Sequence, residues 1–232
     1  MSLGALCARL LAVAELVRQG AVFADIGTDH AHLPIFLFEN GKIEKAVCSD
    51  INKGPLDSAR NNVKEAGFAD KCEFILCDGA EALSGKGITD FAICGMGGEL
   101  IADIIERAPL FKDESLSLIL QPMTKQAHLR RYLYKNGFYI KSETYCSEGE
   151  RHYVIMQVFY SGKSLEISNI EAEIGVETSE YVNKTSQMAY INGKIAAYKK
   201  AANGKIKGGN SAEEELFMLD SLKQTLEKIS LN

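Results

Sequence analysis

The chain has 232 residues, of which 46% are hydrophobic and 25% charged, and its formal net charge is −5. These proportions are typical of a globular protein with one well-filled core and an appendage. No stretch approaches the roughly 18 uncharged apolar residues of a membrane span. Charged residues interrupt the apolar run Leu3–Val17, which therefore predicts a helix face rather than a signal peptide. The negative charge argues against polyanion binding over the whole surface but leaves room for a local basic patch.

The six cysteines contain no CxxC pair. Three of them, Cys48, Cys77 and Cys94, fall at the ends of predicted strands. Reduced, buried thiols are typical of proteins of the reducing cytosol. We therefore expect a cytoplasmic protein with buried, unpaired cysteines.

Strand and helix patterns alternate up to residue 162. Apolar residues at helical spacing predict a first helix that ends at Gly20. Buried apolar runs predict five parallel strands, at Ala21–Ile26, Lys45–Ser49, Glu73–Cys77, Asp90–Cys94 and Leu116–Leu120. Helices are expected at His32–Asn40, at Pro55–Ala66, up to about Ala108 after the fourth strand, and at Lys125–Asn136. Two β-rich runs, Phe138–Thr144 and Tyr153–Tyr160, complete an α/β, doubly wound sheet of seven strands as an antiparallel pair.

From residue 163 onward the pattern is helical only. Apolar residues and tyrosines occupy a heptad repeat at Tyr181, Met188, Ile191, Ile195, Tyr198 and Ala202. After a glycine break at residues 208–210, Ser211 and Glu214 predict a capping box for a last helix with an apolar stripe. We expect residues 163–232 to form a second unit, an antiparallel, coiled-coil-like α-helical hairpin.

The segment Ala21–Pro34 reads as strand, glycine turn and helix. This order predicts a nucleotide-type binding loop, because Gly27 lets the backbone approach a ligand and the N–H groups that open the next helix point at it. A dinucleotide site would carry the G-x-G-x-x-G pattern, which this loop lacks. An NAD-type oxidoreductase is therefore disfavoured.

Three acidic residues, Asp25, Asp50 and Asp78, follow successive strands. The carboxyl ends of parallel strands meet at one edge of the sheet, where ligands bind. One carboxylate can meet the ammonium group of an amino acid, a second the two ribose hydroxyls and a third the adenine amino group. The set suits S-adenosylmethionine, although turns favour Asp for structural reasons as well.

The turn Gly95–Gly98 (GMGG) follows the fourth strand. Methyltransferases of this fold carry the loop between cofactor and acceptor at this place, and glycines there would let a flat base approach the backbone. A plain strand-to-helix turn is the alternative.

Three motifs together, Asp25–Pro34 (DIGTDHAHLP), Gly95–Gly98 and Leu120–Pro122 (LQP), resemble those of the bacterial tRNA (adenine-22-N1)-methyltransferase family. The resemblance covers nearly the whole chain, including the C-terminal hairpin. It implies a Rossmann-like class I methyltransferase domain at residues 1–162, with S-adenosylmethionine as the cofactor. It also implies tRNA as the partner, with N1 of adenine 22 as the acceptor, and neither a membrane nor a protein partner.

The resemblance also implies site residues. The cofactor is expected to meet Asp25, Gly27, Thr28, Asp29, His30, Asp50, Ile51, Asp78, Gly79, Gly95, Met96 and Gly97. The target base is expected against Gly98, Gln121 and Pro122. Adenine N1 has an in-plane lone pair, so the reaction needs positioning and a carboxylate near the cationic product ring. Asp29 is the candidate for that carboxylate, with a helix cap as the alternative, and Gln121 is the candidate for holding the base edge.

Because the net charge is negative, contact with RNA must come from local clusters of basic residues. The segment Lys184–Lys207 holds six lysines and no acidic residue, which is typical of a phosphate-binding face. A solvated helix face with tyrosines in the hairpin seam is the alternative. From this segment we assign Lys184, Lys194, Lys199 and Lys200 to the RNA surface. A second basic patch is expected beside the target base, formed by Lys125, His128, Arg130 and Arg131.

His30 and His32 invite a metal site, but two histidines without a third ligand in phase make a poor one. We therefore expect no metal. Two other functions remain open. A methyltransferase of the same fold that acts on a small molecule or a protein would have no use for the basic hairpin. A non-catalytic S-adenosylmethionine-binding module would bind the cofactor without transfer.

Overall fold

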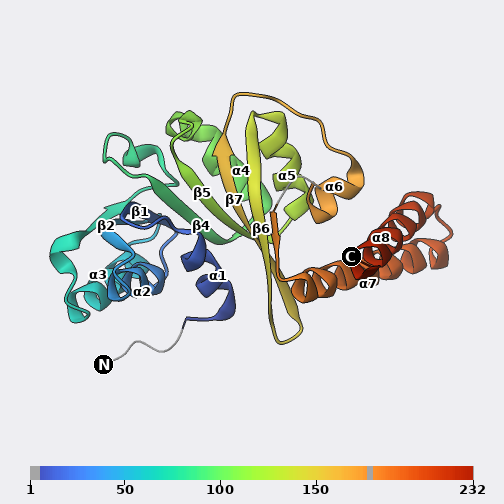
Figure 1. The fold of residues 1–232 in the computed structure, drawn as a ribbon, viewed down its shortest axis with the longest axis horizontal. Coiled ribbons are helices and arrows are strands. Elements are labelled where there is room, and N and C mark those ends of the chain that lie inside the picture. The colour runs from blue at the N-terminus through green and yellow to red at the C-terminus, as the bar shows by residue number, and fades with distance from the viewer. Residues whose placement is uncertain (1–5, 177–179, 232) are drawn as a thin grey trace.

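A mixed sheet with the strand order β3-β2-β1-β4-β5-β7-β6-β8 forms the centre of the molecule (Figure 1). The computed structural model describes residues 6–176 and 180–231, apart from the side chains of residues 180–182. The first five strands run parallel, at Ala21–Ile26 (β1), Ile43–Asp50 (β2), Cys72–Leu76 (β3), Asp90–Gly97 (β4) and Ser117–Thr124 (β5). β7 (Arg151–Tyr160) is antiparallel to both β5 and β6 (Phe138–Glu148). The seven predicted strands and their directions are confirmed.

An eighth strand, β8 (Glu180–Val182), pairs in parallel with β6 at the edge of the sheet. Three residues are too short to show a strand pattern, so the sequence prediction missed it. The prediction placed Tyr181 in the first helix of the hairpin, which is wrong, because that helix begins at Lys184 and Tyr181 lies in β8.

Helices cover both faces of the sheet at Ala8–Leu16 (α1), His32–Glu39 (α2), Lys53–Glu65 (α3), Gly98–Arg107 (α4) and Gln126–Lys135 (α5). The predicted start of α1 at Leu3 lies outside the described residues. Successive strand residues point to opposite faces. Thus Phe23 packs with α1 and α2, while its neighbour Ala24 belongs to the cluster under α4 and α5. None of the described helices is long and apolar enough to cross a lipid bilayer.

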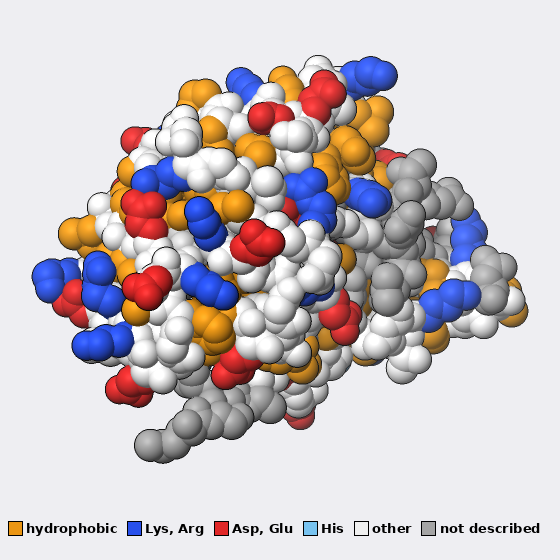
Figure 2. All heavy atoms as spheres, turned by 60° about the vertical axis from the view of Figure 1, so that its left-hand side comes forward, with side chains coloured by type: hydrophobic (Ala, Val, Ile, Leu, Met, Phe, Trp, Pro, Cys, Tyr) orange, Lys and Arg blue, Asp and Glu red, His pale blue; other side chains and the backbone are white. Residues whose placement is uncertain are grey.

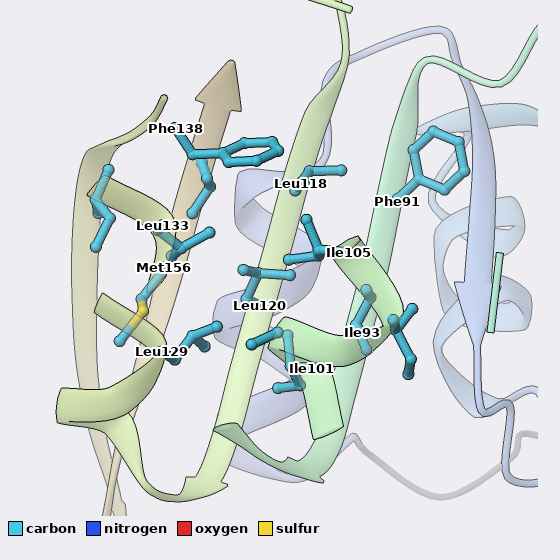
Figure 3. Packing of buried hydrophobic residues seen from close by; sticks show 14 of the residues in the cluster. Phe91, Ile93, Ile101, Ile105, Leu118, Leu120, Leu129, Leu133, Phe138 and Met156 are labelled. Carbon is cyan, nitrogen blue, oxygen red and sulfur yellow. The ribbon is translucent and has the colours of Figure 1, made fainter. Parts of the chain in front are cut away.

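The cluster under α4 and α5 is the largest of the three hydrophobic clusters in the described residues (Figure 3). Leu118 and Leu120 of β5 face Ile101 and Ile105 of α4, and both helices close over the strands. Every one of these four side chains is almost completely buried. The core therefore fixes the start of α4 relative to the end of β4, where the glycine turn lies.

The C-terminal segment contains α6 (Asn169–Ile174) and then α7 (Lys184–Lys207) and α8 (Glu213–Leu231), which form a hairpin projecting from the sheet (Figure 1). The hairpin is thus confirmed, and α7 runs unbroken through its glycines. Its base joins the main core, because Tyr190 and Ile191 lie in the same hydrophobic cluster as the sheet. The division of the chain at residue 162 stays a prediction.

The capping boxes differ from expectation. In α6, the Ser168 hydroxyl accepts from the Glu171 N–H and the Glu171 carboxylate accepts from the Ser168 N–H, which completes a capping box. At α8, Ser211 Oγ accepts instead from the N–H of Glu213, at 3.4 Å, so the Ser211–Glu214 prediction is wrong in its partner. Helix α8 begins at Glu213, one residue later than the capping-box pattern predicts.

All six cysteines are free thiols. Cys48 is buried and the others except Cys7 are partly buried. The prediction of burial is wrong for Cys7, which lies exposed before α1.

Candidate active site

A cleft of about 530 Å³ opens at the carboxyl ends of β1, β2 and β4, where the predicted acidic residues meet. Most of the residues predicted for the cofactor line it: Asp25, Gly27, Asp29, Asp50, Ile51, Asp78, Gly79, Gly95 and Met96. The structure therefore brings together one site from four separate segments of the chain. Sequence reasoning missed several lining residues, among them Arg9, Ser49, Asn52 and Leu100.

Asp25 is the last residue but one of β1, lines the cleft and is 8% exposed. The hydroxyl of the fully buried Thr28 donates a hydrogen bond to Asp25 Oδ2 at 2.7 Å. Burial raises the pKa of Asp25 to about 6, and the Thr28 hydrogen bond opposes part of that rise. A carboxylate in this state gains from a cationic ligand, which would replace the water it has lost.

Gly27 follows at φ 74°, in the left-handed region that favours glycine. A Cβ there would overlap the terminal methyl group of Met96. The β1 turn and the β4 turn therefore approach each other as closely as a glycine permits, and Met96 lies between them on the cleft wall.

Asp50 ends β2 and Ile51 follows it, both on the next side of the cleft. The Asp50 Oδ1 atom accepts from the Asn52 N–H at 2.7 Å, which fixes the carboxylate at the end of the strand. Ile51 is 62% exposed although it is a large apolar residue. An exposed apolar side chain beside a fixed carboxylate suits a flat ring with an attached sugar.

Asp78 and Gly79 follow β3 at the far side of the cleft. Arg107, at the end of α4, donates to both Asp78 oxygens at 3.1 Å. This bidentate pair holds a carboxylate that is otherwise exposed. Arg107 was not predicted, because 29 residues separate it from Asp78 and no local pattern links them.

The segment Gly95–Gly98, predicted as a turn, forms the end of β4 and the first residue of α4, and Gly95 and Met96 line the cleft. A Cβ at Gly98 would overlap the carbonyl oxygen of Lys125, so only glycine allows α4 to begin against the turn before α5. The motif thus brings the ends of β4 and β5 together.

The prediction that Gln121 holds the edge of the target base is wrong. Its side chain is fully buried, and its Oε1 atom accepts from Arg9 Nη1 and from the Gly95 N–H, each at 3.1 Å. Pro122 is buried as well. Gln121 is therefore a positioning residue that ties α1 to the glycine turn, and a direct contact with a base edge does not fit this geometry.

Asp29 lies on the rim of the cleft with its side chain 81% exposed, 3.2 Å from His30 Nε2. The N-cap of α2 is Ala31, without a side-chain cap, so the helix-cap alternative for Asp29 is wrong. His30 and Ala31 have φ values of 61° and 55°, and such left-handed residues cost about 1–3 kcal/mol each. Strain of this kind clusters at ligand-binding loops. Within residues 6–176 and 180–231, no group of three His, Cys, Asp or Glu side chains could hold a metal ion.

The predicted basic patch after Gln121-Pro122 divides into two kinds of residue. Arg130 is fully buried, paired with Glu143 at 2.7 Å and bonded to the carbonyl oxygens of Ala172 and Glu173, so its assignment to RNA is wrong. Arg131 and Lys125 remain exposed. Adjacent arginines thus serve different purposes, and the sequence could not separate them.

The lysines of α7 divide in the same way. Lys194 lies 2.8 Å from a Glu173 oxygen, with its side chain only 20% exposed, and stacks over Tyr190, so it is a structural cation rather than an RNA contact. Within the described residues, Lys205 is exposed but pairs with Glu215, whereas four lysines are exposed without an ion pair: Lys184, Lys199, Lys200 and Lys207. The last three share one shallow groove of the helix. Elsewhere, basic and acidic side chains are interspersed, as the face in Figure 2 shows.

Comparisons with known proteins identify the domain and the family to which the chain is similar. A methyltransferase domain family matches residues 6–156. The Bacillus subtilis (strain 168) tRNA (adenine(22)-N(1))-methyltransferase is 32% identical over 184 residues, which are 79% of this chain and 77% of that protein.

Two solved structures extend the similarity to the whole chain. M. capricolum TrmK, in complex with S-adenosyl-homocysteine, is 28% identical with a TM-score of 0.79, covering 97% of this chain and 99% of that one. Streptococcus pneumoniae Sp1610, in complex with S-adenosyl-L-methionine, is 29% identical with a TM-score of 0.82, covering 96% of this chain and 100% of that one. The similarity therefore includes the C-terminal helices.

Proposed function

This chain belongs to the tRNA (adenine(22)-N(1))-methyltransferase family, and we propose that it transfers a methyl group from S-adenosylmethionine to N1 of adenine 22 in tRNA. The observation that carries the proposal is the cleft in which Asp25, Gly27 and Asp50 meet at the ends of parallel strands. The action on tRNA comes from the relatives, and the cytoplasmic location is proposed because the cysteines are free thiols. No protein partner is implied.

The residues present fit S-adenosylmethionine. The buried carboxylate of Asp25 suits the ammonium group, and the Asp50 carboxylate suits two ribose hydroxyls. Ile51 offers an apolar wall for the adenine ring, and Asp78, held by Arg107, offers an acceptor for its amino group. When bound, this cofactor supplies a methyl group activated by a positively charged sulfur.

The chain's own residues then act mainly by positioning. Adenine N1 attacks with a lone pair, so no base is needed to remove a proton beforehand, and the product ring carries positive charge. The Asp29 carboxylate, exposed on the rim, is the group we assign to that charge. Gly95 and Met96, fixed from behind by Gln121, form the wall between cofactor and acceptor.

Adenine 22 must leave its stack to reach the cleft, which requires contacts that hold the tRNA around it. We assign these contacts to Lys125, which lies beside Glu99 at the start of α4, to Arg131 on α5, and to Lys184, Lys199 and Lys200 on α7. The assignment rests on their exposure and on the lysine-rich composition of α7.

The test is a methyl-transfer assay with labelled S-adenosylmethionine and two unmodified tRNAs that differ only in having adenine or guanine at position 22. Transfer to the adenine tRNA alone is expected. Transfer to both tRNAs would keep the methyltransferase activity and contradict the site of methylation. Binding of S-adenosylmethionine without transfer to either would favour a different acceptor, a small molecule or a protein, or a non-catalytic binding module.

A further inference from the structure

The geometry of attack restricts how the target base can be held. Adenine N1 attacks with a lone pair that lies in the plane of the ring, so the N1 edge must point at the methyl group, at about 3–3.5 Å. A side chain in front of that edge would block the attack. An apolar side chain against one face of the ring would hold the base and leave the edge free. The acceptor side of the cleft therefore needs a surface on which the ring can stack.

The end of β5 is the place for such a surface. Gly95 and Met96, at the end of β4, form the wall between cofactor and acceptor. In the register of the two strands, Met96 lies beside Pro122 and Gly97 lies beside Thr124. Met123 stands between these two β5 residues, and β5 lies on the far side of β4 from β1 and β2. Met123 is thus one strand beyond the wall, on the side of the acceptor.

Met123 is an exposed apolar residue in this position, with 36% of its surface accessible. In the described part of the chain, three other large hydrophobic residues are exposed near the carboxyl edge of the sheet. Ile51 and Leu100 line the cofactor cleft, and Leu76 ends β3 beside Asp50. These three lie on the cofactor side, so Met123 is the one of the four that can face the acceptor.

Gln121 holds the side chain of Met123 in place. The Gln121 Oε1 atom accepts from the Gly95 N–H at 3.1 Å, which leaves the amide nitrogen to donate elsewhere. This nitrogen, Nε2, donates to the Met123 sulfur at 3.4 Å. Residues two apart on a strand point to the same face, and Gln121 is fully buried. One fixed amide therefore sets the position of Met123 relative to Gly95.

We propose that the flipped adenine 22 stacks on Met123 while its N1 edge faces the methyl group. The inference rests on the proposed function, because it takes the same base and the same reaction. A thioether side chain packs well against aromatic rings. Stacking would replace part of the contact that the base loses when it leaves the RNA stack. Met123 then makes the base contact, and Gln121 acts through it as a positioning residue.

The test separates binding of the tRNA from presentation of the base. Met123→Gln replaces the side chain with a polar one of similar length, and Met123→Leu keeps it apolar. Leu165→Gln is the matched control, because Leu165 is a 53% exposed apolar residue before α6, outside the cleft. For each variant we would measure the single-turnover rate of methyl transfer at saturating tRNA and the dissociation constants for tRNA and S-adenosylmethionine. Thermal unfolding checks that each variant is folded.

Met123→Gln is expected to lower the single-turnover rate by about 5–100-fold, as for the loss of one base-stacking contact. The dissociation constant for tRNA should change by less than about 3-fold, because phosphate contacts supply most of the affinity. The dissociation constant for S-adenosylmethionine should stay constant. Met123→Leu should keep the rate within about 3-fold of wild type, since the apolar surface remains. Leu165→Gln should change none of the three quantities.

A second measurement follows the base itself. A tRNA with 2-aminopurine at position 22 becomes more fluorescent when that base leaves the RNA stack. With S-adenosyl-homocysteine present, so that no transfer occurs, the wild-type chain at saturation should increase the fluorescence. Met123→Gln should increase it less, because fewer bound tRNAs hold the base in the flipped state.

Several results overturn the inference while leaving the proposed function intact. They are an unchanged rate in Met123→Gln, equal losses of rate in Met123→Gln and Met123→Leu, and a matching loss of cofactor affinity. The same holds if the fluorescence increases equally with wild type and Met123→Gln, or with neither. If the wild-type chain transfers no methyl group to the adenine tRNA, the proposed function fails, and the inference fails with it.

Discussion

The cleft and the junction between the sheet and the hairpin both contain buried charge, but they use it in opposite ways. At the junction, charges are paired within the chain, as in Arg130–Glu143 and Lys194–Glu173. In the cleft, Asp25, Asp50 and Arg9 have no ion pair with any residue in the described part of the chain. Both regions lose water around ionised groups. The junction restores the interaction internally, and the cleft does so for Asp78, which pairs with Arg107, but not for Asp25, Asp50 or Arg9 within the described residues.

The difference separates structural charge from charge reserved for ligands. A paired, buried charge fixes the position of helices, and losing one partner leaves the other uncompensated. An unpaired charge in a cleft costs stability until a ligand arrives. Substitutions at the junction should therefore act mainly on folding, and those in the cleft mainly on binding and turnover.

The largest expected effect is at the junction. Arg130→Met leaves the buried Glu143 without its cation and removes two hydrogen bonds to the end of α6. We expect the free energy of unfolding to fall by about 3–5 kcal/mol, measured by denaturant titration. The matched control is Arg131→Met, one residue away and exposed, for which the expected loss is below about 1 kcal/mol. Equal losses in the two variants would contradict the structural role of Arg130.

Asp29→Asn tests whether a substitution at the rim of the cleft changes turnover without changing the stability of the fold. Asp29 is exposed, so its removal should leave stability unchanged. If it stabilises the cationic ring, kcat should fall by about 10–100-fold while the dissociation constant for S-adenosylmethionine stays constant. Asp70→Asn, an exposed carboxylate outside the cleft, should change neither. An equal fall in turnover and cofactor affinity would make Asp29 a binding residue only.

Much of the cleft could be predicted from the sequence, because its geometry follows from local order. An acidic residue that directly follows a parallel strand must lie at the carboxyl edge of the sheet, so Asp25, Asp50 and Asp78 were placed together correctly. The glycines of Gly95–Gly98 were expected to let a flat base approach the backbone, whereas the close approach that the structure shows is between Gly98 and the carbonyl oxygen of Lys125.

The roles of individual polar side chains depended on partners far along the chain. Gln121 was assigned to the substrate, but its acceptor oxygen is occupied by Arg9, 112 residues away. Arg130 and Arg131 are neighbours in one basic run, and only the arrival of Glu143 on β6 makes the first of them structural. No local pattern contains this information, since it comes from tertiary packing.

Asp25 should show a trade-off between stability and binding. Its pKa of about 6 in the folded chain exceeds the usual 3.8, so the native state binds the extra proton. Protonation of Asp25 therefore stabilises the folded chain at low pH, and this stabilisation is lost as pH rises from about 4 to about 6. Asp25→Asn, which needs no such proton, should therefore be more stable than wild type at pH 7, by about 1–3 kcal/mol.

The same substitution should weaken cofactor binding, because the ammonium group loses its carboxylate. In the wild-type chain, the affinity for S-adenosylmethionine should fall about 10-fold for each pH unit below about 6, as Asp25 becomes protonated. Calorimetry over pH 5–8 measures this profile, and the Asn variant should show a flat one. A wild-type affinity that is constant from pH 5 to 8 would contradict the assignment of Asp25 to the ammonium group.

The smallest expected effect concerns the lysines of α7. It compares lysines that have no ion pair with a lysine that pairs with a carboxylate. Lys199 and Lys200 are exposed on the helix, whereas Lys205 pairs with Glu215 at 2.6 Å. Replacing both Lys199 and Lys200 with Gln should weaken tRNA binding by about 3–10-fold and lower the slope of log K against log salt by about 1.4–1.8, as for two lost phosphate contacts. Lys205→Gln, the matched control, should change the slope by less than about 0.5, because its charge is already compensated.

If Lys205→Gln weakens tRNA binding as much as the loss of an unpaired lysine, paired charges on the hairpin also reach the RNA. The contrast between the two kinds of charge would then hold only near the sheet.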